Sequence, residues 1–161
     1  MSISGTAKEF LSREVVDFLE KRHTEKVDRK FQNKATTEVL KPVETFELEV
    51  KNNMSNASHE LLQAINRVED CRKQNTELDT ADYLRYARLN LEEAGKDMEA
   101  AELAYKALET YHKRVEKASA VLAHELEAAM LEIFDKLEHM KNLQRNLFEK
   151  VVVLINEVRS E

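Results

Sequence analysis

Apolar side chains recur at every seventh residue over most of the second half of the chain, from Leu91 to Leu154. A second apolar column follows three residues behind the first. A heptad repeat of this length is typical of an α-helix that packs along its whole length in coiled-coil fashion. Since no proline follows Pro42 and no glycine follows Gly95, the pattern predicts one helix over residues 80–160, about 120 Å long.

The first half of the chain predicts two further helices. Apolar residues at helical spacing extend from Ala7 to about Lys34, and a second helical pattern covers residues 38–73. Pro42 lies near the start of that second pattern. Because a proline ring removes a backbone donor and clashes with the preceding turn, Pro42 must begin, kink or break this helix.

The predicted fold class is therefore all-α. Only two glycines, one proline and 35% charged residues point to long helices with few turns. We expect a flexible N-terminus over 1–6 and a single elongated domain over 7–160, built as an antiparallel helical hairpin or coiled-coil bundle with one very long C-terminal helix. The predicted helices are 7–34, 38–73 and 80–160.

The heptad column contains two clearly polar residues, His112 and Ser119. If the chain turns near residue 77, Pro42 lies opposite His112. The weakest part of the apolar seam then adjoins the proline, which predicts a bend in a long hairpin. A histidine at such a position is more often a hydrogen-bonded core residue that fixes register than a ligand.

A two-helix hairpin leaves one side of its apolar seam open to water. We therefore expect a second copy of the chain, or another helical protein, to close it. The predicted homodimer core is the densest apolar part of the last helix, formed by Leu126, Ile133, Leu137, Met140, Leu143 and Leu147.

Basic residues gather in two places. The first cluster lies in 21–34, where Lys21, Arg22, Lys26, Arg29, Lys30 and Lys34 outnumber two acidic residues. The second lies near the predicted turn and consists of Arg67, Arg72, Lys73, Arg85 and Arg88, diluted by acidic neighbours. Solvated helix surface is the ordinary interpretation of such clusters. The alternative is contact with an anionic membrane or an acidic partner.

The whole chain carries a net charge of −6, which disfavours nucleic-acid binding. Its longest apolar run, Val151–Ile155, is far too short to span a membrane. One cysteine and no recognisable secretory signal predict a cytoplasmic protein, with peripheral membrane association as a further option.

Catalytic patterns are absent from the sequence: it has no nucleophilic triad, no glycine-rich phosphate loop and no Cys/His metal spacing. We therefore expect no enzyme activity, no cofactor and no small-molecule substrate. Two Glu-x-x-His pairs, Glu20/His23 and Glu109/His112, resemble half of a di-metal centre in a helical bundle. A metal-binding bundle is a remote alternative, because such pairs arise by chance among many helical glutamates.

Two segments resemble BAR domains. The run Val39-Leu40-Lys41-Pro42-Val43-Glu44-Thr45-Phe46 resembles the proline-containing kink that begins their second long helix. The run Ala87-Arg88-Leu89-Asn90-Leu91-Glu92-Glu93-Ala94, continuing through Ala101 and Tyr105, resembles the start of their third. The resemblance implies a crescent-shaped antiparallel dimer that binds curved membranes, with Arg67, Arg72, Lys73, Arg85 and Arg88 as tip contacts.

These observations favour a non-enzymatic helical scaffold that dimerises through a long coiled-coil seam and presents an elongated surface, with a BAR-like membrane-binding module as its specific form. The main alternative is a coiled-coil adaptor or assembly subunit that binds only protein.

Overall fold

The computed structural model describes residues 3–20, 34–73 and 80–160. All of the described chain is helical apart from the residue between the last two helices. The elements are α1 (Ile3–Glu9), the π-helix η1 (Phe10–Glu14), α3 (Lys34–Lys73), α4 (Thr80–Ala118) and α5 (Ala120–Ser160).

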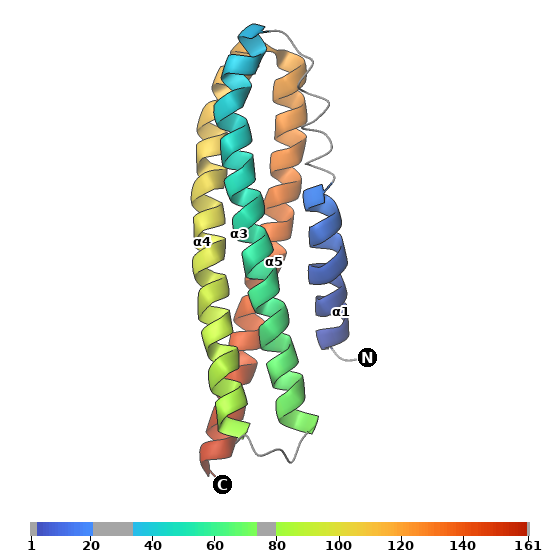
Figure 1. Ribbon diagram of the computed structural model, residues 1–161, viewed down its shortest axis with the longest axis vertical. Helices are drawn as coiled ribbons and strands as arrows, with labels where there is room; N and C mark the ends of the chain where they lie inside the picture. The colour runs from blue at the N-terminus through green and yellow to red at the C-terminus, as the bar shows by residue number, and fades with distance from the viewer. Residues whose placement is uncertain (1–2, 21–33, 74–79, 161) are drawn as a thin grey trace.

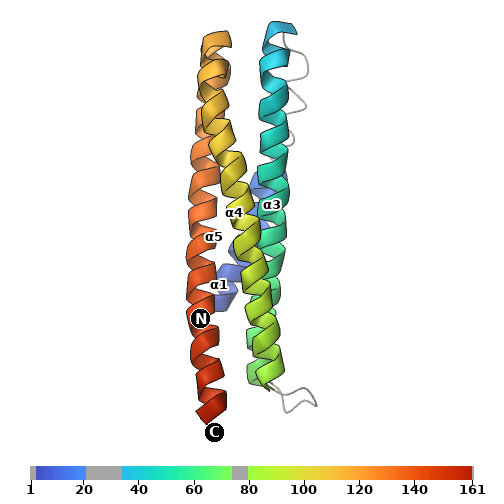
Figure 2. The ribbon, with the colours of Figure 1, turned by 90° about the vertical axis from the view of Figure 1, so that its left-hand side faces the viewer.

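The three long helices lie side by side and alternate in direction (Figure 1). α3 descends in that view, α4 ascends and α5 descends, and the views in Figures 1 and 2 agree on this order. The N-terminal helical segment is much shorter and packs beside α3 and α5 near mid-height. The last turns of α5 extend past the start of α4. The fold is thus an antiparallel bundle of three long helices, and the N-terminal helical segment covers only part of its length.

The prediction of a single helix over 80–160 is wrong, because the chain reverses direction at Ser119. Ser119 is the only residue between α4 and α5, and its Oγ accepts a hydrogen bond from the backbone N–H of Leu122 at 3.4 Å, as an N-cap does. His112 Nε2 lies 3.1 Å from the carbonyl oxygen of Ala123, on the first turn of α5. The two polar heptad residues therefore mark the fold-back point.

The boundaries of the earlier helices also differ from the prediction. α3 begins at Lys34 and passes through Pro42, so the proline neither starts nor ends the helix. Helical structure at the N-terminal end begins at Ile3, before the predicted start at Ala7. The remainder of the predicted helix 7–34, beyond Glu20, lies outside the described residues.

One core runs through the bundle and follows the predicted apolar stripes. Residues at heptad positions on the three long helices are almost wholly buried, among them Leu61, Leu91, Leu108 and Met140. The heptad pattern continues across Ser119 although the chain folds back there. A straight helix and a helical hairpin bury the same apolar stripe, against different neighbours.

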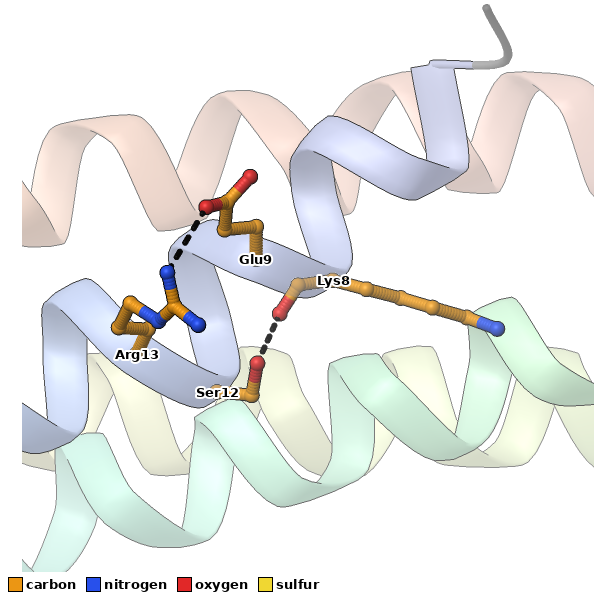
Figure 3. Close-up of polar contacts among 4 residues, drawn as sticks. All are labelled: Lys8, Glu9, Ser12 and Arg13. Atoms are coloured by element: carbon orange, nitrogen blue, oxygen red, sulfur yellow. Dashed lines mark hydrogen bonds and ion pairs between the residues drawn. The ribbon is translucent and has the colours of Figure 1, made fainter.

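The N-terminal segment is held to α3 by polar contacts as well as by apolar ones. In the π-helix the carbonyl of Leu11 accepts a hydrogen bond from the buried Ser58 hydroxyl at 2.9 Å. Figure 3 shows the Lys8 side chain extending toward α3, where its Nζ pairs with Glu69 Oε2 at 2.6 Å. Glu9 and Arg13, which pair with each other at 3.3 Å, remain on the exposed side.

Candidate interaction surface

The lower end of the bundle in Figure 1 brings together the end of α3, the start of α4 and the end of α5. The five predicted tip residues all lie on the last two turns of α3 or the first three turns of α4, with Arg67 the farthest from the end of α3. Arg72 and Lys73 belong to the final turn of α3, but their side chains lie outside the description. The three described side chains have different roles.

Arg67 is engaged inside the α3/α4 interface. Its Nε donates to Asn90 Oδ1 at 3.0 Å, and Asn90 Nδ2 donates to Glu60 Oε2 at 2.7 Å. The guanidinium also lies 5.0 Å from the centre of the Tyr86 ring. These contacts tie Arg67 to two residues of α4, so it is a link between helices rather than a freely presented charge.

Arg85 and Arg88 point outward, with side chains 71% and 54% exposed. Arg85 Nη1 lies 3.5 Å from Asp82 Oδ1, and Arg88 Nε lies 3.4 Å from Glu92 Oε1. Exposed pairs of this kind contribute between about 0 and 1 kcal/mol. Both arginines can therefore exchange these local partners for another anion at small cost.

A groove lies beside these arginines, between the first turns of α4 and the last turns of α5. Its volume is about 430 Å³, within the range typical of ligand sites. Aliphatic side chains of α5 form most of one wall and the two arginines lie on α4. The lining residues are Ala81, Arg85, Arg88, Val152, Ile155, Asn156 and Val158.

The run Val151–Ile155 is the signal in the sequence that could have located this groove. It is the longest apolar run of the chain, and it is too short to span a membrane. Another role must therefore account for these apolar residues. In the bundle it lies where α5 passes the start of α4. Val151 is fully buried, whereas Val152 is 38% and Val153 is 55% exposed. Clustered exposure of aliphatic residues is typical of contact surfaces.

The first basic cluster falls outside the described part of the chain. This applies to Lys21, Arg22, Lys26, Arg29 and Lys30, and the side chain of Lys34 is likewise outside the description.

The residues predicted as a dimer core are used within one chain. Leu126, Ile133, Leu137 and Met140 are each at most 4% exposed, Leu143 is 9% exposed, and Leu147 is partly buried against the same core. The seam that we expected a second copy to close is closed here by α5 itself, because the chain folds back at Ser119.

The Glu-x-x-His pairs do not assemble a metal site in the described part of the chain. Among residues 3–20, 34–73 and 80–160, no group of three or more His, Cys, Asp or Glu side chains is placed to hold a metal ion. His112 instead contacts the Ala123 carbonyl, which confirms its interpretation as a hydrogen-bonded residue. His23 lies outside the described residues.

Carboxylates gather on α3 and α4 near the Arg67–Asn90 link. Partial burial, followed by the charges of Glu60 and Glu93, raises the pKa of the Asp97 carboxyl above its ordinary value of 3.8. Farther along α4, partial burial and the charge of Glu109 raise the pKa of Tyr105. Both shifts have ordinary structural causes, and neither residue belongs to the groove.

None of the described helices is long and apolar enough to cross a membrane. No protein-family model matches the chain, and neither the curated proteins nor the solved structures contain a match to it. The resemblance of two segments to BAR domains therefore stays a prediction.

Proposed function

We propose that this chain is a non-enzymatic helical scaffold that forms homodimers and binds an anionic membrane surface, from the cytoplasm, as a peripheral protein. A BAR-like module is the specific form of this proposal. The observation that carries it is the groove at the end of α5, where the exposed Val152 and the half-buried Ile155 and Val158 adjoin two exposed arginines. An anionic membrane offers the matching combination of negative head groups and apolar chains.

Local charge decides whether such a surface can work on a chain of net charge −6. Each arginine near an anionic membrane contributes about 1 kcal/mol. Arg85 and Arg88 lie together, and a dimer doubles their number. The acidic residues elsewhere on the bundle are screened over distances beyond about 8 Å at physiological salt. The two arginines can thus act against the diffuse acidity once they exchange Asp82 and Glu92 for anionic head groups.

Sedimentation with anionic liposomes tests the proposal. Wild-type protein should pellet with phosphatidylserine vesicles, and pelleting should weaken steeply with added salt. Replacing both Arg85 and Arg88 by Glu should abolish pelleting and leave helicity unchanged. Lys106→Glu combined with Arg145→Glu, at exposed positions elsewhere on α4 and α5, changes the net charge equally and is the matched control, which should change pelleting little. Failure of the wild type to pellet at low salt, with vesicles of any diameter, would overturn the membrane proposal.

A protein-only adaptor is the second candidate, and the neighbours of the arginines favour it. Asp82 and Glu92 lie within 3.5 Å of Arg85 and Arg88, which lowers the local positive charge available to a membrane. An amphipathic helix from a partner would use the aliphatic wall first and the arginines second. In that case Ile155→Asp should abolish capture of a helical partner, whereas the double Arg→Glu variant should only weaken it.

A further inference from the structure

We infer that α5 can exchange between two copies of the chain, with Ser119 as the hinge, so that residues 80–160 form one continuous helix in the dimer. This inference rests on the proposed homodimer and names its interface. The partner is a second copy of this chain, and its α5 occupies the place that α5 of the same chain occupies in the bundle.

The hinge is as short as a hinge can be. One residue separates α4 from α5. Backbone bonds of the helical i to i−4 kind already exist on both sides, from Ser119 N–H to the Val115 carbonyl at 2.8 Å and from Ala123 N–H to the Ser119 carbonyl at 3.0 Å. No described residue has a positive φ, and no glycine or proline lies near the hinge. Opening it therefore needs changes at few dihedral angles.

The heptad repeat runs through the hinge without a shift. Tyr105, His112, Ser119, Leu126 and Ile133 are spaced by seven. If Ser119 served only as a turn, the heptad positions of α5 would not need to continue those of α4. A continuous register means that the straight helix keeps all of these side chains on one stripe, as a coiled-coil helix requires.

The contacts between α4 and α5 are arranged symmetrically about Ser119. The Gln144 amide donates to the Leu91 carbonyl at 3.0 Å, Lys141 pairs with Glu102, and the Tyr105 and Phe134 rings lie 6.2 Å apart. Each pair is centred within about three residues of Ser119. Two antiparallel copies of a straight 80–160 helix, related by a two-fold axis at Ser119, would therefore make the same pairs between chains.

The exchange changes little in the core. Leu126, Ile133 and Met140 leave their own α4 and meet the same α4 surface of the partner. Domain exchange of this kind is a low-cost route to a dimer, and short hinges favour it. The resulting pair of helices, each about 120 Å long, would form an elongated dimer instead of a compact monomer.

Crosslinking distinguishes the two arrangements. The test uses Glu102→Cys with Lys141→Cys in a Cys71→Ser background, treated with a short bis-maleimide after refolding at increasing concentration. The folded-back chain gives only crosslinks within one chain. The exchanged dimer gives a band at twice the 18.7 kDa mass of the chain on a denaturing gel. The control pair Lys106→Cys with Arg145→Cys, at exposed positions, should give no such band.

Substitutions at the hinge should shift the equilibrium in opposite directions. Ser119→Ala removes the cap on α5 and favours the continuous helix, whereas Ser119→Gly keeps a tolerated cap and disfavours it. Each hinge should contribute about a five-fold change, so the dimer dissociation constants of the two variants should differ by about 25-fold. Sedimentation equilibrium measures both constants.

Three results would overturn the exchange. A dimer with crosslinks only within chains would be a side-by-side dimer, which leaves the proposed function standing. A wild-type monomer at 100 µM, a concentration of about 10⁻⁴ M, would contradict both the exchange and the proposed homodimer. Equal dissociation constants for the Ala and Gly variants would remove Ser119 as the hinge.

Discussion

The two interfaces that α4 makes, with α3 and with α5, differ in how closely the helices approach each other. Small side chains allow helix axes to approach closely, and α3 and α4 lie closer together over their length than α4 and α5 do. Both α3 and α4 bury alanines at heptad spacing among larger residues. These alanines are Ala57 and Ala64 on α3 and Ala87, Ala94 and Ala101 on α4. Toward α5, the facing helix buries mainly Leu, Ile and Met. Both interfaces also carry polar contacts, made by Gln144 and Lys141 toward α5 and by the Arg67–Asn90 bond toward α3.

This difference between the two interfaces indicates which helix can be exchanged between chains. Where buried alanines let two helices approach closely, larger residues would force the helices apart, so the interface fits a neighbour only at that distance. The wider interface between α4 and α5 can be re-formed by an identical helix from another chain. The α3/α4 hairpin is thus the fixed half of the bundle, and α5 is the half that can be exchanged.

The largest expected effect comes from a charge placed in the α5 core. Ile133 is 3% exposed, whereas Leu131, two residues earlier, is 65% exposed. Ile133→Asp should lower the free energy of unfolding by about 4 kcal/mol or more, because the carboxylate has no partner in the core. Leu131→Asp should change it by at most about 0.5 kcal/mol. Urea denaturation followed by circular dichroism measures both, and equal effects would contradict the placement of α5.

Overpacking the α3/α4 interface should come next. Ala94 is fully buried, and Ala94→Leu should cost about 1–3 kcal/mol by forcing α3 and α4 apart. The same substitution at Ala128, which is exposed on α5, should be nearly neutral. If Ala94→Leu were tolerated as well as Ala128→Leu, the contrast between a tight and an exchangeable interface would be lost.

A smaller effect is expected where Gln144 crosses from α5 to α4. A Cβ on Gly95 would lie 2.8 Å from Gln144 Nε2, so glycine makes room for the bond from Gln144 to the Leu91 carbonyl. Gln144→Ala should cost about 1 kcal/mol.

Replacing Gly95 by Ala tests the same contact from the other helix. Gly95→Ala should stabilise the protein by up to about 1 kcal/mol in the Gln144→Ala background, through helix propensity. It should stabilise the wild type less, because there it displaces the amide. A double-mutant cycle by thermal denaturation measures the coupling, and strict additivity would show that the two residues do not compete.

The smallest effect concerns pH. The pKa of Asp97 is raised in the folded state by partial burial and by Glu60 and Glu93, so the folded chain binds this proton more tightly than the unfolded chain does. The ionised carboxylate therefore lowers stability, and this loss develops as pH rises through the shifted pKa. Asp97→Asn should raise the melting temperature at pH 7 and lose that advantage in acid. An equal gain at all pH values would contradict this cause.

Helix content and the buried stripes could be predicted from the sequence because both depend on local periodicity. Leu91, Leu126 and Met140 are buried as the heptad requires. The reversal at Ser119 could not be predicted in the same way, because it breaks neither periodicity nor helix propensity. The one local signal was polarity: Ser119 and His112 stand in an apolar column, and both make the contacts that hold the turn.

The tip residues show the opposite limit. Sequence position correctly places Arg67 and Arg85 near the same end of the hairpin, since α3 ends and α4 begins at the predicted residues. Whether each points outward depends on its neighbours across the interface. Arg67 meets Asn90 and Tyr86, and no single-helix pattern contains that information.

The bond from Ser58 to the Leu11 carbonyl joins α3 to the part of the bundle that should open first. The N-terminal segment has few turns and buries a small share of the core, so it should be the least stable cooperative unit, and amides in it should exchange with solvent before those of α3 and α4. Its departure would leave the Ser58 hydroxyl, now 4% exposed, facing water on an otherwise intact three-helix core. The N-terminal segment thus covers a face of the bundle that includes Ser58 on α3 and His139 on α5.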